Sequence, residues 1–298
     1  MKGEKLFLVA NPKSGRARVK TVLLTIVDIL TRGGYSVTVY PPADRGDATK
    51  VLSELSNEYS TVVCCGGDGT LNEVITGIMQ NKNDFKIGYI PLGTLNEWSS
   101  GLHISRDVKK AAADILTGSV TPLDIGMFGN SYFAYTASFG AFTSASYSAP
   151  QDVKNALGQT AYLLEGIKTL GNIKPTRLEF NIDGNVIRGD FLFGAISNSL
   201  SMGGIIKLDE TAVSLNDGLF EVLLIENPDT LNEFNDILDA LMKRDFNRKR
   251  IKMFKGKEIT VKSRGATDWT LDGEHAVAEK LLTVKNINKA INFIIPDK

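Results

Sequence analysis

The feature that most restricts the fold is a regular alternation of two hydrophobic periods over the first 120 residues. Strands and helices in strict turn are typical of βαβ units, whose right-handed crossovers build a parallel sheet. The pattern therefore predicts an α/β domain over residues 1–122. Its expected strands are residues 6–10, 35–40, 61–65 and 86–91, and its expected helices are residues 17–30, 47–55, 71–79 and 107–116.

After Pro122 the pattern changes to strand-like runs separated by Gly, Asn and Asp. Asp183-Gly184-Asn185, between two such runs, predicts a β-hairpin turn. Two helical stretches interrupt the runs, near residues 153–170 and 230–242. We expect a second, mainly β domain over residues 123–287.

Charge and cysteine content exclude some classes of protein. The 34 Lys and Arg residues balance 34 Asp and Glu residues, which argues against a nucleic-acid-binding protein because such binding needs a surface field of one sign. Cys64 and Cys65 are adjacent, so they point to opposite faces of a strand and do not suggest a disulfide. With no signal-like segment and no apolar run of about 18 residues, we expect a cytoplasmic protein.

A glycine-rich loop follows the third expected strand, where the chain reads Gly66-Gly67-Asp68-Gly69-Thr70 before a helix. Glycines let the backbone approach a ligand closely, and the free N–H groups at a helix start attract anions. The loop fits a phosphate cradle, and the alternative is a glycine-rich turn in which Asp68 or Thr70 only caps the helix. Its spacing matches neither a P-loop nor a dinucleotide-binding fingerprint.

Two further polar loops, residues 11–16 and 91–97, follow strands of the same expected sheet. The carboxyl ends of parallel strands meet at one edge, so the three loops should converge there. Each loop alone reads equally well as an ordinary turn of an α/β domain. Together they predict a nucleotide site.

Six motifs run in order through residues 11–274: Asn11-Pro12-x-Ser14-Gly15, Gly66-Gly67-Asp68-Gly69-Thr70-Leu71-Asn72-Glu73, Pro91-x-Gly93-Thr94-x-Asn96, Leu123-Asp124-Ile125-Gly126, Asn216-Asp217-Gly218 and Leu271-Asp272-Gly273-Glu274. In this order they resemble the motifs of the diacylglycerol kinase catalytic-domain family, and the chain is similar to its soluble bacterial lipid kinases. The resemblance implies an α/β domain like those of NAD kinase and phosphofructokinase, followed by a β-sandwich-like domain. It also implies an ATP site in the cleft and a return of residues 288–298 to the first domain.

The resemblance further implies which residues act. Asp68 would lie beside the phosphates and their Mg²⁺, and Glu274 would be the catalytic base that accepts the proton of the lipid hydroxyl. Asp124 would order metal or water, or else cap the interdomain turn. The implied ATP-binding residues are Asn11, Ser14, Gly15, Gly66, Gly67, Asp68, Gly69, Thr70, Leu71, Asn72, Glu73, Thr94, Asn96 and Asp124.

A structural magnesium ion is also implied by the resemblance. The carboxylate of Asp217 and the carbonyl oxygens of Ser214 and Leu219 would hold it, a donor set that suits Mg²⁺. Without the resemblance, Asp217-Gly218 reads as a turn leading into a strand.

The sequence departs from the family pattern at two places. Pro42 stands where many members have a threonine that helps to bind nucleotide, and Glu97 stands where an aspartate is usual. These positions leave open the preference for ATP over another nucleotide.

Access to a membrane lipid would need a docking surface. Residues 243–257 contain eight Lys and Arg side chains and one acidic residue, Asp245. Basic side chains near an anionic leaflet contribute about 1 kcal/mol each, although a solvated helix end and turn is the alternative. Residues 132–142 have a high apolar content and residues 144–150 are rich in Ala and Tyr, and both would either line an acyl-chain pocket or form core.

The sequence thus predicts an ATP- and Mg²⁺-dependent lipid kinase, with diacylglycerol as the first candidate acceptor. A homodimer and transient contact with the inner membrane surface fit the resemblance. One alternative is another kinase on the same nucleotide fold, similar to NAD kinase. The other is a catalytically silent regulator that binds a lipid or a nucleotide.

Overall fold

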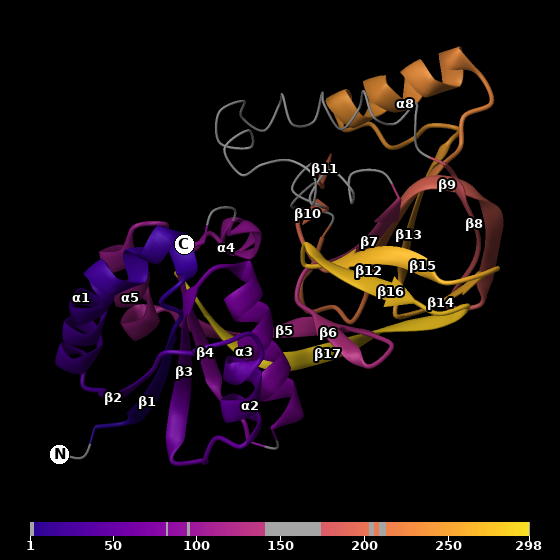
Figure 1. Ribbon diagram of the computed structural model, residues 1–298. Helices are drawn as coiled ribbons and strands as arrows, with labels where there is room; N and C mark the ends of the chain where they lie inside the picture. Colours follow the sequence, from indigo (N-terminus) through magenta and orange to yellow (C-terminus); the bar gives the residue numbers. More distant parts are fainter. Residues whose placement is uncertain are drawn as a thin grey trace. The chain divides into compact units, whose positions relative to one another are not determined.

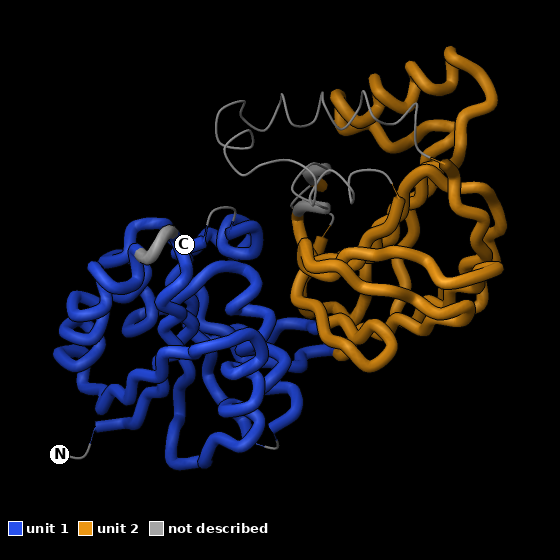
Figure 2. Tube along the Cα trace, viewed as in Figure 1, with its two compact units in different colours: residues 1–125, 288–298 blue, residues 126–287 orange. Residues whose placement is uncertain are grey.

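The computed structural model divides the chain into two compact units (Figures 1 and 2), the first comprising residues 1–125 and 288–298 and the second residues 126–287. The structure describes residues 3–81, 83–93, 96–140, 174–202, 206–208 and 213–297. Two strands run across the boundary, β5 (Ser119–Phe128) and β17 (Leu281–Ile295). The expected helix at residues 153–170 lies outside the described residues.

The first unit is built on a parallel sheet in the order β17-β4-β3-β1-β2. The residues of β17 that join it are Asn292 and Phe293, which pair with the start of β4. β1, β3 and β4 are almost wholly buried, as parallel strands covered on both faces are. The four strands contributed by the N-terminal part of the chain are β1 (Lys5–Ala10), β2 (Ser36–Tyr40), β3 (Tyr59–Gly66) and β4 (Lys86–Pro91).

Helices lie on both sides of this sheet, with α1 packed against α5 and α2 packed against α3 (Figure 1). Four of these helices match the expected periodic segments. The structure adds α4, whose five residues are too few for a hydrophobic period to be visible in the sequence. The helical elements are η1 (Ser14–Ala17), α1 (Arg18–Arg32), α2 (Asp47–Ser53), α3 (Asp68–Gln80), α4 (Glu97–Gly101) and α5 (Val108–Thr117).

The second unit is antiparallel. Its longest internal strand, β9, pairs with β8 along its first half and lies between β7 and β12 along its second half. Asp183 and Gly184 have φ angles of 47° and 95°, which confirms the expected hairpin turn between β8 and β9. The remaining elements are β6 (Ser131–Phe133), β7 (Thr136–Gly140), β8 (Thr176–Ile182), β9 (Asn185–Ser197), β10 (Ser201–Met202), β11 (Ile206–Lys207), β12 (Phe220–Glu226), α8 (Leu231–Lys243), β13 (Ile251–Gly256), β14 (Glu258–Ser263), β15 (Thr267–Leu271) and β16 (Glu274–Ala278).

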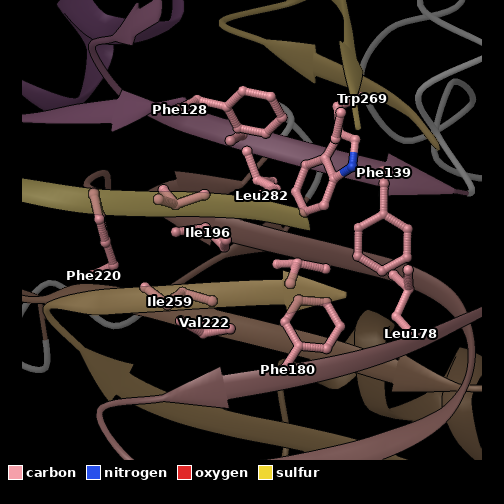
Figure 3. Packing of buried hydrophobic residues seen from close by; sticks show 14 of the residues in the cluster. Phe128, Phe139, Leu178, Phe180, Ile196, Phe220, Val222, Ile259, Trp269 and Leu282 are labelled. Carbon is pink, nitrogen blue, oxygen red and sulfur yellow. The ribbon is translucent and has the colours of Figure 1, made fainter. Parts of the chain in front are cut away.

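Aromatic side chains fill the interior of this unit (Figure 3). Phe139 packs on Trp269 with ring centroids 4.8 Å apart and on Phe180 at 6.0 Å. Phe133, Ala137 and Phe139 belong to the same core, which agrees with the core alternative for the described part of the apolar run at residues 132–142. Residues 141–150 lie outside the described residues.

The expected fold class is confirmed: an α/β unit precedes a mainly β unit. No helix among the described residues has both the length and the hydrophobicity needed to cross a membrane.

Candidate functional site

Three loops meet at the carboxyl ends of β1, β3 and β4. The backbone N–H of Asn11 donates to the carbonyl oxygen of Cys65 at 3.1 Å, and its side-chain Nδ2 donates to Thr70 Oγ1 at 2.8 Å. The N–H of Leu92 donates to the carbonyl oxygen of Gly66 at 2.7 Å. The first and third loops are therefore both bonded to the glycine-rich loop between them.

Glycine is required where these loops touch. A Cβ atom on Gly93 would lie 2.6 Å from the Cα of Gly67, and one on Gly15 would lie 2.2 Å from the carbonyl oxygen of Leu92. Gly15 also has a φ of 58°, in the left-handed region that glycine occupies readily. The surface at this edge is consequently made largely of main chain, which a phosphate can approach closely.

The glycine-rich loop runs into α3 without a side-chain cap. Gly67 is the N-cap residue, and Thr70 instead accepts the hydrogen bond from Asn11. Since a helix start leaves its first N–H groups without intrahelical partners, these groups are available to an anion. Neither Asp68 nor Thr70 is the N-cap of α3, so that part of the alternative is wrong.

Asp68 connects the glycine-rich loop to the third loop. Its Oδ2 accepts a hydrogen bond from the backbone N–H of Glu97, at the start of α4, at 3.2 Å. The structure thus brings Asp68 and Glu97 together. The neighbouring Thr94 lies outside the described residues.

Asn96 is buried and shapes the third loop from within. Its Oδ1 accepts hydrogen bonds from the N–H of Gly93 at 2.8 Å and from the Tyr89 hydroxyl at 3.2 Å, and its Nδ2 donates to the Gly93 carbonyl at 2.7 Å. The backbone of Asn96 has a φ of 47°. Its side chain therefore holds the turn against β4.

The other residues of the first two loops divide into exposed and buried positions. Leu71 is buried in the interior of the unit, whereas Asn72 and Glu73 are half-buried on α3. Ser14 donates its backbone N–H to the Asn11 carbonyl at 3.1 Å and begins η1. Gly69 is exposed.

Lys13 is a residue of the first loop that the sequence motifs do not single out. Its Nζ donates to the carbonyl oxygen of Ala43 at 2.6 Å and lies 3.7 Å from Asp44 Oδ1. It thereby ties the first loop to the turn that contains Pro42, which is itself buried. In the sequence, the only signal for the contact of Lys13 with Ala43 and Asp44 is that Lys13 belongs to a polar loop.

Asp124 is fully buried in β5. Its Oδ1 accepts hydrogen bonds from Asn288 Nδ2 at 2.8 Å and from the backbone N–H of Lys289 at 2.7 Å. Lys289 has a φ of 52°, so Asp124 stabilises a left-handed turn of the backbone within β17.

Glu274 follows a tight turn between β15 and β16, where Asp272 and Gly273 have φ angles of 50° and 84°. Its side chain is exposed at the first residue of β16. The turn is short, and it places Glu274 at the start of β16, which pairs with β15, while β15 pairs with β7 on its other side.

Asp272 anchors this turn and is buried. Its carboxylate accepts three backbone hydrogen bonds, from Ala134 at 2.6 Å, Tyr135 at 2.9 Å and Thr136 at 3.1 Å. A buried carboxylate bound by three N–H donors fixes the turn much more firmly than an Asp-Gly sequence suggests. Sequence reasoning missed this role because the donors lie about 140 residues away.

Asp217 lies in the turn that leads into β12. Its Oδ1 accepts a hydrogen bond from the Leu219 N–H at 3.0 Å, and its Oδ2 lies 3.8 Å from the ammonium of Lys255. Ser214 Oγ donates to Asn216 Oδ1 at 3.2 Å in the same turn. A partly exposed carboxylate is a ligand type that Mg²⁺ accepts, whereas the neighbouring ammonium of Lys255 opposes the binding of a cation there.

The basic segment at residues 243–257 is largely neutralised by carboxylates. Arg250 contacts Asp229, Glu233 and Glu226, and Arg248 contacts three aspartates of α8 and the turn after it. The segment begins at the end of α8 and continues through a turn into β13. Ion pairs hold five of the eight basic side chains: Lys243, Arg248, Lys249, Arg250 and Lys255.

Comparisons with known proteins agree with this geometry. Residues 5–128 match the model of the diacylglycerol kinase catalytic domain, and residues 137–294 match that of the YegS C-terminal NAD kinase beta sandwich-like domain. The chain is 32% identical over 270 residues to a diacylglycerol kinase of Bacillus subtilis, covering 90% of this chain and 89% of the relative. The chain belongs to the diacylglycerol kinase family.

Two further comparisons agree with that assignment. A Staphylococcus aureus diacylglycerol kinase is 35% identical over 271 residues, covering 90% of this chain and 85% of its own. A crystal structure of a diacylglycerol kinase from Bacillus anthracis superposes with a TM-score of 0.78 at 21% identity, covering 99% of this chain and 98% of that chain, and so shares the fold. Family membership makes the chain a lipid kinase that uses ATP.

Proposed function

We propose that this member of the diacylglycerol kinase family transfers the γ-phosphate of ATP to the hydroxyl of a membrane lipid alcohol, with diacylglycerol as the preferred acceptor. The observation that carries the proposal is the joining of three polar loops by Asn11, Thr70 and Leu92 at one edge of the parallel sheet. The curated relatives named diacylglycerol kinase support the choice of acceptor.

The nucleotide is proposed to bind on main-chain groups. The glycine-rich loop, residues 66–70, would hold the phosphates with the N–H groups at the start of α3, and Asn11, Ser14 and Gly15 would border them. Thr94 is proposed to complete this rim. Leu71 and Asn96 would act by packing and by shaping the loops, because both side chains are buried.

Glu274 is the proposed general base. Its exposed carboxylate would accept the proton of the lipid hydroxyl while that oxygen attacks the γ-phosphorus and ADP leaves. Asp272 is a positioning residue that holds the turn in place. The proposal requires this turn of the second unit to reach the phosphates bound by the first.

Two groups of residues are proposed to hold Mg²⁺. Asp68 would lie beside the ion that accompanies ATP, and Asp217, with the carbonyl oxygens of Ser214 and Leu219, would hold a structural ion. When bound with ATP, Mg²⁺ neutralises charge that develops on the transferred phosphoryl group. Asp124, bound to β17, is proposed to act on this network through the backbone that it holds.

Contact with an anionic membrane is proposed to be peripheral. Among the described residues, no ion pair is found for Arg244, Lys252 or Lys257, which leaves these three side chains of the basic segment for lipid headgroups. A homodimer and transient residence at the inner membrane surface remain part of the proposal by family resemblance.

The test is phosphate transfer from γ-labelled ATP to a panel of lipid alcohols in mixed micelles with Mg²⁺. We expect diacylglycerol to be labelled by the wild type and labelling to fall by about 10² to 10⁴ in Glu274→Gln. Labelling of NAD in place of every lipid would replace the proposal with the NAD kinase alternative. If the protein binds ATP but labels no acceptor, the result would favour the alternative of a catalytically silent regulator.

A further inference from the structure

Ser197 is the last residue of β9 and is fully buried. Its hydroxyl donates to the backbone carbonyl oxygen of Tyr135 at 2.9 Å, and the backbone N–H of Asn198 donates to the same oxygen at 2.9 Å. A carbonyl oxygen has two lone pairs, so these two donors match its full capacity. The end of β9 therefore holds the carbonyl group that lies directly before the start of β7.

The peptide group that Ser197 binds also contacts Asp272. The carbonyl of Tyr135 and the N–H of Thr136 belong to one planar peptide group, and that N–H donates to Asp272 Oδ1 at 3.1 Å. Hydrogen bonds in such a chain polarise one another, so a bond accepted by the carbonyl strengthens the bond that the N–H donates. One rigid group therefore joins the hydroxyl of Ser197 to the carboxylate of Asp272.

Asp272 in turn fixes the backbone that carries Glu274. Its carboxylate accepts the N–H groups of residues 134–136, and its own N–H donates to the carbonyl oxygen of Thr136 at 2.9 Å. Only Gly273 separates Asp272 from Glu274, in a turn with φ angles of 50° and 84°. A shift of residues 134–136 would therefore move the Glu274 carboxylate through this short turn.

We propose that Ser197 positions Glu274 for proton transfer, through the peptide group and the Asp272 carboxylate that lie between them. The inference rests on the proposed role of Glu274 as general base and adds to it a positioning residue on β9. Without the hydroxyl, the Tyr135 carbonyl keeps one of its two donors, so the fold is retained while the peptide group is held less firmly. Proton transfer is sensitive to such a change because a displacement of about 1 Å can cost about a hundredfold in rate.

The test measures kcat and KM for diacylglycerol phosphorylation, together with the Kd for ATP, in the full chain. We expect Ser197→Ala to lower kcat about tenfold and to leave the KM and the Kd within about twofold of the wild type. Ser197→Cys keeps nearly the same side-chain volume but is a weak donor, and it should lower kcat to a similar extent. A kcat of Ser197→Cys equal to that of the wild type would mean that volume matters and the hydrogen bond does not.

A second comparison uses Glu274→Gln as the background. If Ser197 acts through the Glu274 carboxylate, removing its hydroxyl costs little once that carboxylate is absent. Ser197→Ala should therefore lower the residual kcat of Glu274→Gln by less than about twofold. A residue that only stabilises the fold would lower kcat by the same factor in both backgrounds.

Ser138 provides the matched control. Its hydroxyl is also buried, lies on β7 and is 2.8 Å from Thr270 Oγ1 of β15, so it binds a side chain and not the peptide group that contacts Asp272. Ser138→Ala should leave kcat within about twofold of the wild type. Circular dichroism identifies variants that fail to fold, and if Ser197→Ala is one of them, Ser197→Cys takes its place in both comparisons.

Different results identify different failures. If the wild type labels no lipid, or if Glu274→Gln keeps full turnover, the proposed function fails and the inference falls with it. If Glu274→Gln loses turnover while Ser197→Ala and Ser197→Cys keep it, the base stands and Ser197 does not position it. An equal loss of kcat in Ser197→Ala and Ser138→Ala would also overturn the inference.

Discussion

The loops of the first unit and the turns of the second unit are held in place by different means. In the first unit, backbone atoms of neighbouring loops meet where glycines remove side chains, as at Gly67 and Gly93. In the second unit, carboxylates reach across strands, as Asp272 does to residues 134–136. The first arrangement should therefore fail when atoms are added, and the second when charge is removed.

Adding one carbon atom tests the first half of this comparison. Gly93→Ala places a Cβ atom 2.6 Å from both the Gly67 Cα and the Asn96 Oδ1, so the loops must separate. We expect the Kd for ATP, measured by isothermal titration calorimetry, to rise about 30-fold or more, equivalent to about 2 kcal/mol. Gly265→Ala is the control, because a Cβ atom there meets nothing within 4 Å. Equal affinity of the two variants would contradict the account.

Removing one charge tests the second half. Asp272→Asn replaces one carboxylate oxygen with an amide nitrogen, which cannot accept a hydrogen bond from an N–H group, and we expect a loss of roughly 2–3 kcal/mol in the free energy of unfolding. Asp268→Asn removes a carboxylate from the same hairpin, where the side chain is exposed and pairs with His275. Urea unfolding should show less than about 0.5 kcal/mol for this control. A similar loss of stability in both variants would contradict the claim that the hydrogen bonds of Asp272 stabilise this turn.

The ion pairs of α8 give the second unit a sensitivity to acid. Lys249 and Arg250 lower the pKa of Glu233 to about 2 from its ordinary value of 4.5. A carboxylate with a depressed pKa stabilises the fold above its unfolded pKa, and this contribution is lost as the pH falls through the folded value. The difference in Tm between wild type and Glu233→Gln should thus shrink from pH 6 to pH 2. A difference that stays constant over this range would contradict the depressed pKa.

For the buried thiols of β3 we expect the smallest change in reactivity and in stability. Burial raises the pKa of Cys65 to about 12 and raises that of Cys64 as well. Both thiols should remain neutral and unmodified by iodoacetamide at pH 8 until the chain unfolds. Because the unfolded thiols ionise near pH 9, stability should decline gradually from pH 9 toward pH 12. Rapid labelling of the folded protein at pH 8 would show that β3 opens readily.

The difference between the loops of the first unit and the turns of the second unit also explains which features could be predicted from the sequence. The alternation of strands and helices and the three loops of the first unit are local features, since Asn11, Gly66 and Leu92 each directly follow or end a strand. The edge of a parallel sheet then brings the loops together whatever the spacing between them.

The second unit was harder to predict because its important contacts join distant strands. Nothing near Asp272 reveals that residues 134–136 bind its carboxylate. Likewise, the local excess of basic residues at 243–257 suggested a charged surface, whereas α8 and its flanking turns supply carboxylates to Arg248 and Arg250. The side chain of Lys255 is bound to β12, which a count of charges along the chain cannot show.

The central claim is that nucleotide binding belongs to the loops of the first unit and proton transfer to Glu274 of the second. The most direct test measures ATP affinity and lipid phosphorylation side by side in Glu274→Gln. The account predicts a Kd for ATP within about twofold of the wild type and turnover lower by at least about a hundredfold. Turnover close to that of the wild type, or a loss of ATP binding that accounts for the whole decrease, would contradict it.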